Sequence, residues 1–275
     1  MRKALAAALG LLSVFGGDFR VFAVDDDGKT VKSGTSEYFD NQKDAEKSLA
    51  GTGFFSSLKP FAFGARQTVP ADIEAKFDIP NLGPGDPHKS YQVILQPGHF
   101  GRTSGRTGGA GANVTEQELV AFIIAKTAAY LIANNIDVLT IPADEINKTG
   151  LHADIFLAVH ADTAKKPCTT GPSLGYAKGS SLLGMHSIGF ALATSMGQTY
   201  ADFKKDNFTV GEHEYYAFKF ITTKGYGGLL ELGELTCPAV ENALISNAEL
   251  IAHNLGVALK ASVEIVEASE PSKGG

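Results

Sequence analysis

Short apolar runs alternate with longer amphipathic segments from about Lys89 onward, and this alternation limits the folds open to the chain. The short runs are rich in β-branched residues and leucine, as strands buried on both faces are, and lie at residues 91–95, 136–141, 154–159 and 228–232. Helical patterns occupy residues 116–134, 186–203 and part of 240–266. The alternation predicts an α/β fold: a central, mostly parallel sheet flanked by helices on both faces, with a small N-terminal extension.

The residues outside this region divide into a leader, an extension and a tail. Arg2 and Lys3 precede an apolar run of twelve residues, which is typical of a signal peptide ending near residue 23. The alternative is an amphipathic or core helix followed by a strand at 19–24. Residues 24–88 are predicted to form an N-terminal extension and linker, with a hairpin bend at Asp27-Gly28 and a Pro/Gly-rich passage before Lys89. Residues 89–268 form the main domain and 269–275 a polar tail.

Charge and cysteine usage exclude several classes of function. A formal net charge of −6 offers no basic surface for nucleic acid. After the leader, no run approaches the roughly 18 apolar residues of a membrane helix, so we expect no membrane span. Cys168 and Cys237 are not in a C-x-x-C pair, so a metal site would use His and carboxylate ligands. The two cysteines are either free thiols or one disulfide.

Two histidines follow separate predicted strands. His99 lies in QPGHFG after the first strand, and His160 ends another strand in AVHAD. The carboxyl ends of parallel strands meet at one edge of a sheet, where functional groups gather. A lone histidine is more often a packed or surface residue than a ligand, but two at this edge favour a metal site.

The third ligand is predicted from helix geometry. In NVTEQELVAF, Thr115 and Glu118 form a T-x-x-E capping box, which occupies Glu118. Glu116 lies four residues before Val120 on the inward face of the helix, where an unpaired carboxylate costs several kcal/mol. The alternative is a solvated acid favoured by the helix dipole. Two imidazoles and one carboxylate leave a fourth tetrahedral position, the arrangement of catalytic Zn²⁺.

A zinc hydrolase also needs an acid/base. Glu231 lies within an apolar strand, where a charge has little structural use, and is the candidate. Glu234, three residues later, is the competitor and is interpreted as a solvated loop acid. Asp162 is a candidate to orient an imidazole or, alternatively, to cap a turn.

These residues resemble the zinc-dependent N-acetylmuramoyl-L-alanine amidase family, the amidase_3 type. The motifs are QPGHFG at 96–101, EQEL at 116–119, AVHAD at 158–162 and LELGEL at 230–235, in the family's order. The resemblance covers roughly residues 90–265.

The resemblance implies both site residues and activity. It places His99, Glu116 and His160 as zinc ligands and Glu231 as the catalytic glutamate of an α/β amidase domain. The implied reaction is hydrolysis of the amide between N-acetylmuramic acid and L-alanine in peptidoglycan, by an extracytoplasmic enzyme, periplasmic or secreted. Gln96 stands where the family usually has Asp, which alters the expected surroundings of His99.

Three further residues are candidates for substrate binding. Arg102 and Arg106 follow the first histidine on a Gly-rich loop and could pair with stem-peptide carboxylates; solvated loop charges are the alternative. Tyr176 follows the His160 strand and is a candidate to line the groove. Two other functions remain open: a zinc hydrolase of another amide, and a non-catalytic peptidoglycan-binding protein. The chain lacks H-E-x-x-H, and its motifs identify no activating protein partner.

Overall fold

The computed structural model describes residues 37–61, 78–144, 150–204 and 212–269. These residues belong to one compact unit, Ser33–Gly275. The predicted signal peptide and the hairpin at Asp27-Gly28 lie outside the described residues, as do residues 270–275 of the tail. Among the described helices, none is both long and apolar enough to cross a membrane.

A five-stranded sheet forms the centre of this unit, in the order β2-β1-β3-β5-β4. The strands are β1 (Ser90–Pro97), β2 (Val138–Thr140), β3 (Leu151–Asp162), β4 (Ser173–Tyr176) and β5 (Ile221–Glu234). β1 is parallel to β2 and β3, and β3 is parallel to β5; only β4 is antiparallel, paired with β5. The predicted α/β fold with a mostly parallel sheet is confirmed.

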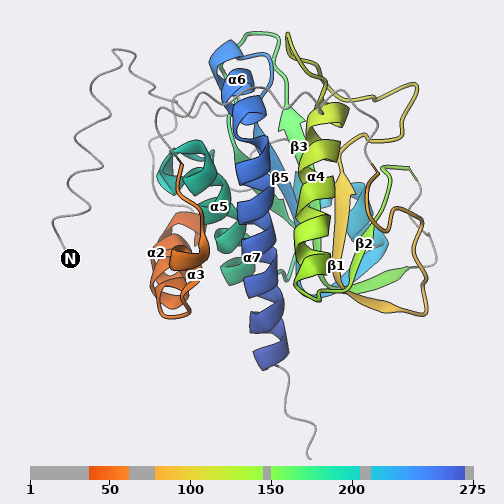
Figure 1. Cartoon of the computed structure of the whole chain (residues 1–275), viewed down its shortest axis with the longest axis vertical. Coiled ribbons are helices and arrows are strands. Elements are labelled where there is room, and N and C mark those ends of the chain that lie inside the picture. The colour runs from red at the N-terminus through yellow and green to blue at the C-terminus, as the bar shows by residue number, and fades with distance from the viewer. Residues whose placement is uncertain (1–36, 62–77, 145–149, 205–211, 270–275) are drawn as a thin grey trace, which may run out of the picture. The chain divides into compact units, whose positions relative to one another are not determined.

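Three long helices cover one face of the sheet: α4 (Glu116–Ala133), α5 (Leu182–Met196) and α7 (Ala248–Ser269) (Figure 1). They share one apolar core with alternate strand residues such as Val93, Leu157 and Leu230. Side chains alternate between the faces of a strand, so the neighbours Ile94, Phe156 and Leu229 belong to a second cluster on the other face.

The second face is covered by short elements. Among the described residues, these are η2 (Glu212–Glu214), η3 (Tyr216–Lys219) and the residues around them. Tyr215, Tyr216, Phe218 and Phe220 pack against the second cluster. The helices that flank this face are therefore 3-10 turns, which have too few residues to show a helical period in the sequence.

The described part of the N-terminal extension packs on the same unit. It contains α2 (Glu37–Ala50) and α3 (Phe54–Ser57), which lie beside α5 in Figure 1. Leu49, Phe54 and Leu58 join the core shared by the three long helices. Two remaining helices are η1 (Tyr200–Asp202), which follows α5, and α6 (Pro238–Ser246), which begins with proline and precedes α7.

Candidate metal centre and active site

The sheet brings three predicted site residues to one edge. β1 and β3 pair in parallel up to Pro97 and Val159, so His99 and His160 emerge together beyond that pair. In the pairing of β3 with β5, His160 lies opposite Glu231. The predicted convergence of strand ends is thereby confirmed.

Glu116 reaches the same edge from the first position of α4. Thr115 caps the helix, and Glu118 completes the predicted capping box by accepting from the Thr115 backbone N–H. Glu116 is buried, and its Oε2 accepts a hydrogen bond from the Gly109 N–H at 2.9 Å. Its Oε1 accepts from the Ala161 N–H at 3.2 Å. These bonds aim the carboxylate between the two imidazoles.

His99, Glu116 and His160 form a compact set of ligand atoms. Glu116 Oε1 lies 3.0 Å from His160 Nδ1 and 3.6 Å from His99 Nε2. One atom from each of the three residues lies within 4.8 Å of the others. The residues can therefore hold a metal ion, as the sequence predicted.

Two glycines permit this close packing. A Cβ atom at Gly98 would lie 2.5 Å from His160 Nδ1, and one at Gly108 would lie 2.7 Å from Glu116 Oε2. The chain at His99 itself adopts a positive φ of 58°, an uncommon conformation for a residue with a side chain. The glycines of QPGHFG and of the loop after it thus serve the site's geometry.

The protonation states of His99 and Glu116 favour the binding of a cation. Burial lowers the pKa of His99, which keeps its imidazole neutral at neutral pH. Burial acts to raise the pKa of Glu116, but the hydrogen bond and charge of His160, the charge of His99 and the Gly109 N–H together lower it, so the carboxylate is ionised. A neutral imidazole and an anionic carboxylate both present lone pairs.

Each imidazole also has a partner on its outer nitrogen. His99 Nδ1 lies 2.7 Å from the Arg106 carbonyl oxygen and 3.0 Å from Arg102 Nη1. A guanidinium only donates, so His99 Nδ1 cannot both donate to the carbonyl and accept from Arg102. Arg102 Nη1 also lies 3.2 Å from the same carbonyl oxygen. We therefore assign His99 Nδ1 and Arg102 Nη1 as two donors to the Arg106 carbonyl. His160 Nε2 lies 3.1 Å from the Tyr215 hydroxyl.

Glu231 is buried beside the three potential ligands. Burial raises its pKa well above the ordinary range, and the negative charges of Asp162, Glu116 and Glu212 raise it further. Among the described residues, its Oε2 has no hydrogen-bond partner. A carboxyl group with a raised pKa keeps its proton at a pH where an ordinary glutamate is ionised, as a catalytic acid must.

A cavity of about 360 Å³ opens over these groups. Its lining includes His99, Glu116, His160, Asp162 and Glu231 together with the loop 105–109. Asp162 therefore lines the cavity, and its charge helps to raise the pKa of Glu231. The ring nitrogens of His160 contact Glu116 and Tyr215, which are the residues that orient this imidazole.

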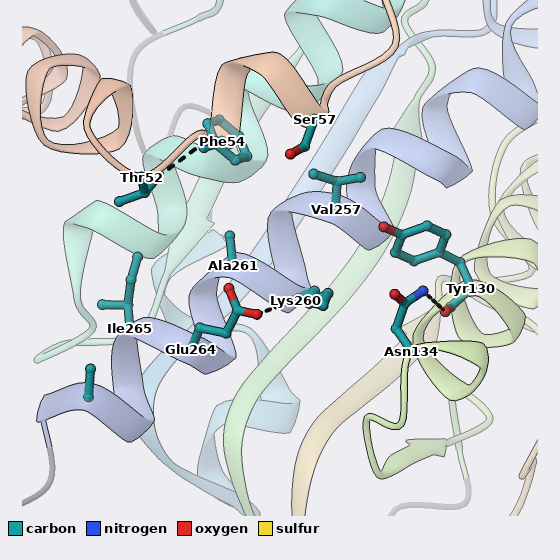
Figure 2. Close-up of a pocket in the computed structure, with 11 residues that line it drawn as sticks. Thr52, Phe54, Ser57, Tyr130, Asn134, Val257, Lys260, Ala261, Glu264 and Ile265 are labelled. Carbon is teal, nitrogen blue, oxygen red and sulfur yellow. Dashed lines mark hydrogen bonds and ion pairs between the residues drawn. The ribbon is translucent and has the colours of Figure 1, made fainter.

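A larger cavity, about 480 Å³, shares no lining residue with this site; Figure 2 shows the residues that line it. It is lined by residues of the α2–α3 turn, the end of α4 and α7, among them Phe54, Tyr130 and Lys260. Tyr130 is 14 residues along α4 from Glu116, or about 20 Å at 1.5 Å per residue. Size therefore does not identify the reactive cavity here.

Glu234 is not the solvated loop acid that the sequence suggested. It is the last residue of β5 and is fully buried. Its carboxylate accepts from the backbone N–H groups of Cys168, Thr169 and Thr170 at 2.6–2.7 Å, and from the Thr236 hydroxyl. Burial acts to raise its pKa, but these hydrogen bonds outweigh that effect and lower it. Glu234 holds the loop after β3.

The three candidates for substrate binding differ in placement. Arg102 donates from Nε to Asp144 at 2.8 Å and supports the His99 loop. Arg106 is exposed and lines the cavity. Tyr176 lies outside this cavity: it is opposite Gly228 in the β4–β5 pairing and packs against the core.

The sequence did not reveal Tyr215, which contacts the site, or Glu241, which supports the segment before α4. Tyr215 connects His160 to Gln96, whose Oε1 accepts the tyrosine hydrogen bond at 2.7 Å. Gln96 was expected to alter the surroundings of His99. Its side chain instead contacts Tyr215, which in turn contacts His160. Glu241 accepts from the Asn113 and Val114 N–H groups and fixes the approach to α4. Neither residue lies in a periodic pattern that marks function.

Of three comparisons with known proteins, only the one with solved structures found similar proteins. No protein-family model matches the chain, and no curated protein matches it significantly. Among solved structures, the chain is similar to an amidase from Clostridium difficile 630, with 20% identity over 67% of this chain and 99% of that chain (TM-score 0.47). It is also similar to the CwlV catalytic domain from Bacillus (Paenibacillus) polymyxa, with 16% identity over 64% and 99% (TM-score 0.49).

A third similar structure is AmiC2 of Nostoc punctiforme, with 14% identity over 63% of this chain and 97% of that chain (TM-score 0.48). All three are N-acetylmuramoyl-L-alanine amidases. The identities are too low to transfer the role of any residue, so roles in this chain rest on its own geometry.

Proposed function

We propose that this chain is a zinc-dependent amidase that hydrolyses the bond between N-acetylmuramic acid and L-alanine in peptidoglycan. The observation that carries the proposal is the convergence of His99, Glu116 and His160 on one point, beside the buried carboxyl group of Glu231. Three protein ligands with an adjacent acid/base are the arrangement of catalytic zinc sites.

The spacing of the ligand atoms fits zinc. With ligand bonds of about 2.0–2.1 Å, tetrahedral zinc holds its ligands about 3.4 Å apart. The separations of 3.0 and 3.6 Å from Glu116 Oε1 lie on either side of that value. When bound, zinc supplies Lewis acidity, which polarises a carbonyl oxygen and acidifies water.

Glu231 is the group that moves protons in this proposal. It takes a proton from the attacking water as the new C–O bond forms at the lactyl carbonyl carbon. When the C–N bond breaks, Glu231 returns the proton to the nitrogen of L-alanine. Its raised pKa supports these roles, because the carboxyl group must take the proton from water and hold it until the amine departs.

Arg106 is the proposed contact for the stem peptide. Its side chain is exposed on the loop that lines the cavity, close enough to the ligands for its carbonyl to contact His99. A guanidinium group there can pair with a peptide carboxylate in bidentate fashion. Arg102 supports the loop instead, through Asp144.

The proposed substrate places the enzyme outside the cytoplasm, and the leader at residues 1–23 is the proposed export signal. The pairing of Cys168 with Cys237 in a disulfide supports this location, because disulfides persist in oxidising compartments. N-terminal sequencing of the mature protein from the native cell tests the export step. An intact Met1 on the mature protein would contradict it.

Mass analysis of products from purified peptidoglycan tests the reaction itself. Cleavage of the proposed amide releases stem peptides with a free L-alanine amine and leaves intact glycan strands carrying lactyl carboxylates. Fragments cut within the peptide would show another amide substrate. Binding of peptidoglycan by the zinc-loaded protein without any release would show a binding protein.

A further inference from the structure

We propose that Tyr215 and Gln96 form a positioning relay that keeps a proton on Nε2 of His160 and leaves the lone pair of Nδ1 facing the metal site. The inference deepens the proposed function and rests on its metal centre. It follows from a chain of hydrogen bonds whose direction is fixed at one end by a backbone carbonyl.

The chain starts at the Pro142 carbonyl oxygen, which only accepts hydrogen bonds. Gln96 is buried, and its Nε2 donates to that oxygen at 3.3 Å. The opposite orientation of the amide would bring two acceptor oxygens together. The carbonyl therefore fixes Oε1 of Gln96 on the side of Tyr215.

The next link sets the tyrosine. Oε1 of Gln96 only accepts, and it lies 2.7 Å from the Tyr215 hydroxyl. A phenol has one proton, so this contact uses the only hydrogen that Tyr215 can donate. Toward His160 the same oxygen can only accept.

The last link sets the imidazole. His160 Nε2 lies 3.1 Å from the Tyr215 oxygen and must carry the proton of that hydrogen bond. In a neutral imidazole the other nitrogen then holds a lone pair. That nitrogen, Nδ1, is the atom 3.0 Å from Glu116 Oε1. Two acceptors that face each other at this distance need a cation between them, either a proton or a metal ion.

His99 has the corresponding arrangement through a different partner. Its Nδ1 faces the Arg106 carbonyl at 2.7 Å, which leaves Nε2 for the metal. Ligand histidines commonly donate their second ring proton to such an acceptor, which fixes the tautomer and the ring orientation. Tyr215 with Gln96 gives His160 the same support from side chains.

The surroundings of Tyr215 make it a rigid acceptor. Its ring packs edge-on against His160, with centroids 5.5 Å apart, and against Phe218 at 5.7 Å. The adjacent Tyr216 donates from its hydroxyl to the Ala143 carbonyl and anchors the segment. Replacing Tyr215 by Phe keeps the ring contacts and removes only the oxygen.

The test compares Tyr215→Phe with Tyr200→Phe. Tyr200 belongs to a second buried Tyr–His pair, in which its hydroxyl lies 3.0 Å from Nδ1 of His186 in the core. The Tyr200→Phe control also removes a tyrosine–histidine hydrogen bond, but its histidine, His186, is not one of the potential metal ligands. Zinc affinity is measured by chelator competition on each full-length protein, with folding checked by thermal unfolding.

We expect Tyr215→Phe to weaken zinc binding by about 10–100-fold and Tyr200→Phe to leave it at the wild-type value. Nitrogen NMR of the zinc-loaded wild type should show the metal on Nδ1 of His160 and a proton on Nε2. Equal zinc affinities for the two variants, or zinc on Nε2 of His160, would overturn the proposal. Both measurements omit peptidoglycan, so a protein that binds zinc as expected but releases no stem peptide would overturn the proposed hydrolysis and leave the relay intact.

Discussion

The buried side chain of Glu231 lowers the stability of the folded state. A buried carboxyl group surrounded by Asp162, Glu116 and Glu212 gains nothing from ionisation, which is why its pKa is raised. A polar atom buried without a partner costs about 1–3 kcal/mol, and Glu231 Oε2 is such an atom among the described residues. A residue that costs stability at a cavity beside potential metal ligands is explained by chemistry.

The pH dependence of stability should show this cost in zinc-free protein. Because the pKa of Glu231 is higher in the folded state than in the unfolded chain, its contribution is fully present below about pH 4 and is lost as the pH rises through the folded pKa. Glu231→Gln does not ionise and should remove this decline. Urea unfolding of wild type and variant from pH 4 to 8 measures it; parallel curves would contradict the raised pKa.

The proposed metal ligands give a second prediction. His160→Ala removes one of the three proposed ligands, and Glu116 loses a hydrogen-bond partner. Elemental analysis should find one zinc per chain in the wild type and much less in the variant. A full equivalent in His160→Ala would rule out the ligand set.

Residues were predicted from the sequence where their environment follows from an element. His99, His160 and Glu116 could be assigned because strand ends and a helix start determine where they lie. Glu234 was misread because its partners are backbone N–H groups of a loop 64–66 residues away in the chain. Tyr215 was missed for the same reason, since its partners come from β1 and β3.

The loop after β3 is the element that Glu234 supports. Three consecutive N–H groups point at one carboxylate, and Gln in its place would turn an amide N–H toward some of these donors. Hydrogen bonds to charged groups are each worth about 1.5–3 kcal/mol, so we expect Glu234→Gln to lower the free energy of unfolding by about 3 kcal/mol.

Urea unfolding measures this loss, with Glu249→Gln as the control because the Glu249 side chain is 68% exposed. The control should match the wild type within about 0.5 kcal/mol. An equally silent Glu234→Gln would show that the loop does not depend on this carboxylate. Activity losses in Glu234→Gln are expected to follow from the loop, without a change in zinc content.

Among the elements, α4 and the four predicted strands were found, but β3 and β5 are 12 and 14 residues long, about twice and nearly three times their predicted lengths. β4 was missed because Ser173–Tyr176 has only four residues and no alternation. The C-terminal helix was predicted as one element within residues 240–266, but the chain forms α6 and α7, separated by Asn247. Asn247 caps α6, and its Nδ2 donates to the Ala243 carbonyl, a local contact that a helical period does not reveal.

On the scale of the whole molecule, the Cys168–Cys237 disulfide joins the loop after β3 to the start of α6. Its cysteines are 69 residues apart, and closing a loop of that length restricts the unfolded chain by about 4 kcal/mol. The double variant Cys168→Ser, Cys237→Ser should therefore unfold at lower urea concentration. An unchanged midpoint would show that the hydrogen bonds of this loop, including those to Glu234, hold it without the disulfide.

Zinc is also expected to act on the whole molecule. A ligand bound only by the folded state at 1,000 times its dissociation constant stabilises it by about 4 kcal/mol. Removal of metal with a chelator should lower the melting temperature of the wild type and restore it when zinc returns. The same treatment should leave His160→Ala unchanged, whereas an equal shift in both proteins would place the metal elsewhere.

Glu231 is proposed to perform the chemistry at the assembled metal site. The most direct measurement is the rate of stem-peptide release from purified peptidoglycan by zinc-loaded wild type and Glu231→Gln. Positioned proton transfer contributes about 10²–10⁴ to a rate, so the variant should keep its zinc and fold and lose release by about that factor. Release by Glu231→Gln at the wild-type rate, with zinc bound to both proteins, would rule out Glu231 as the acid/base.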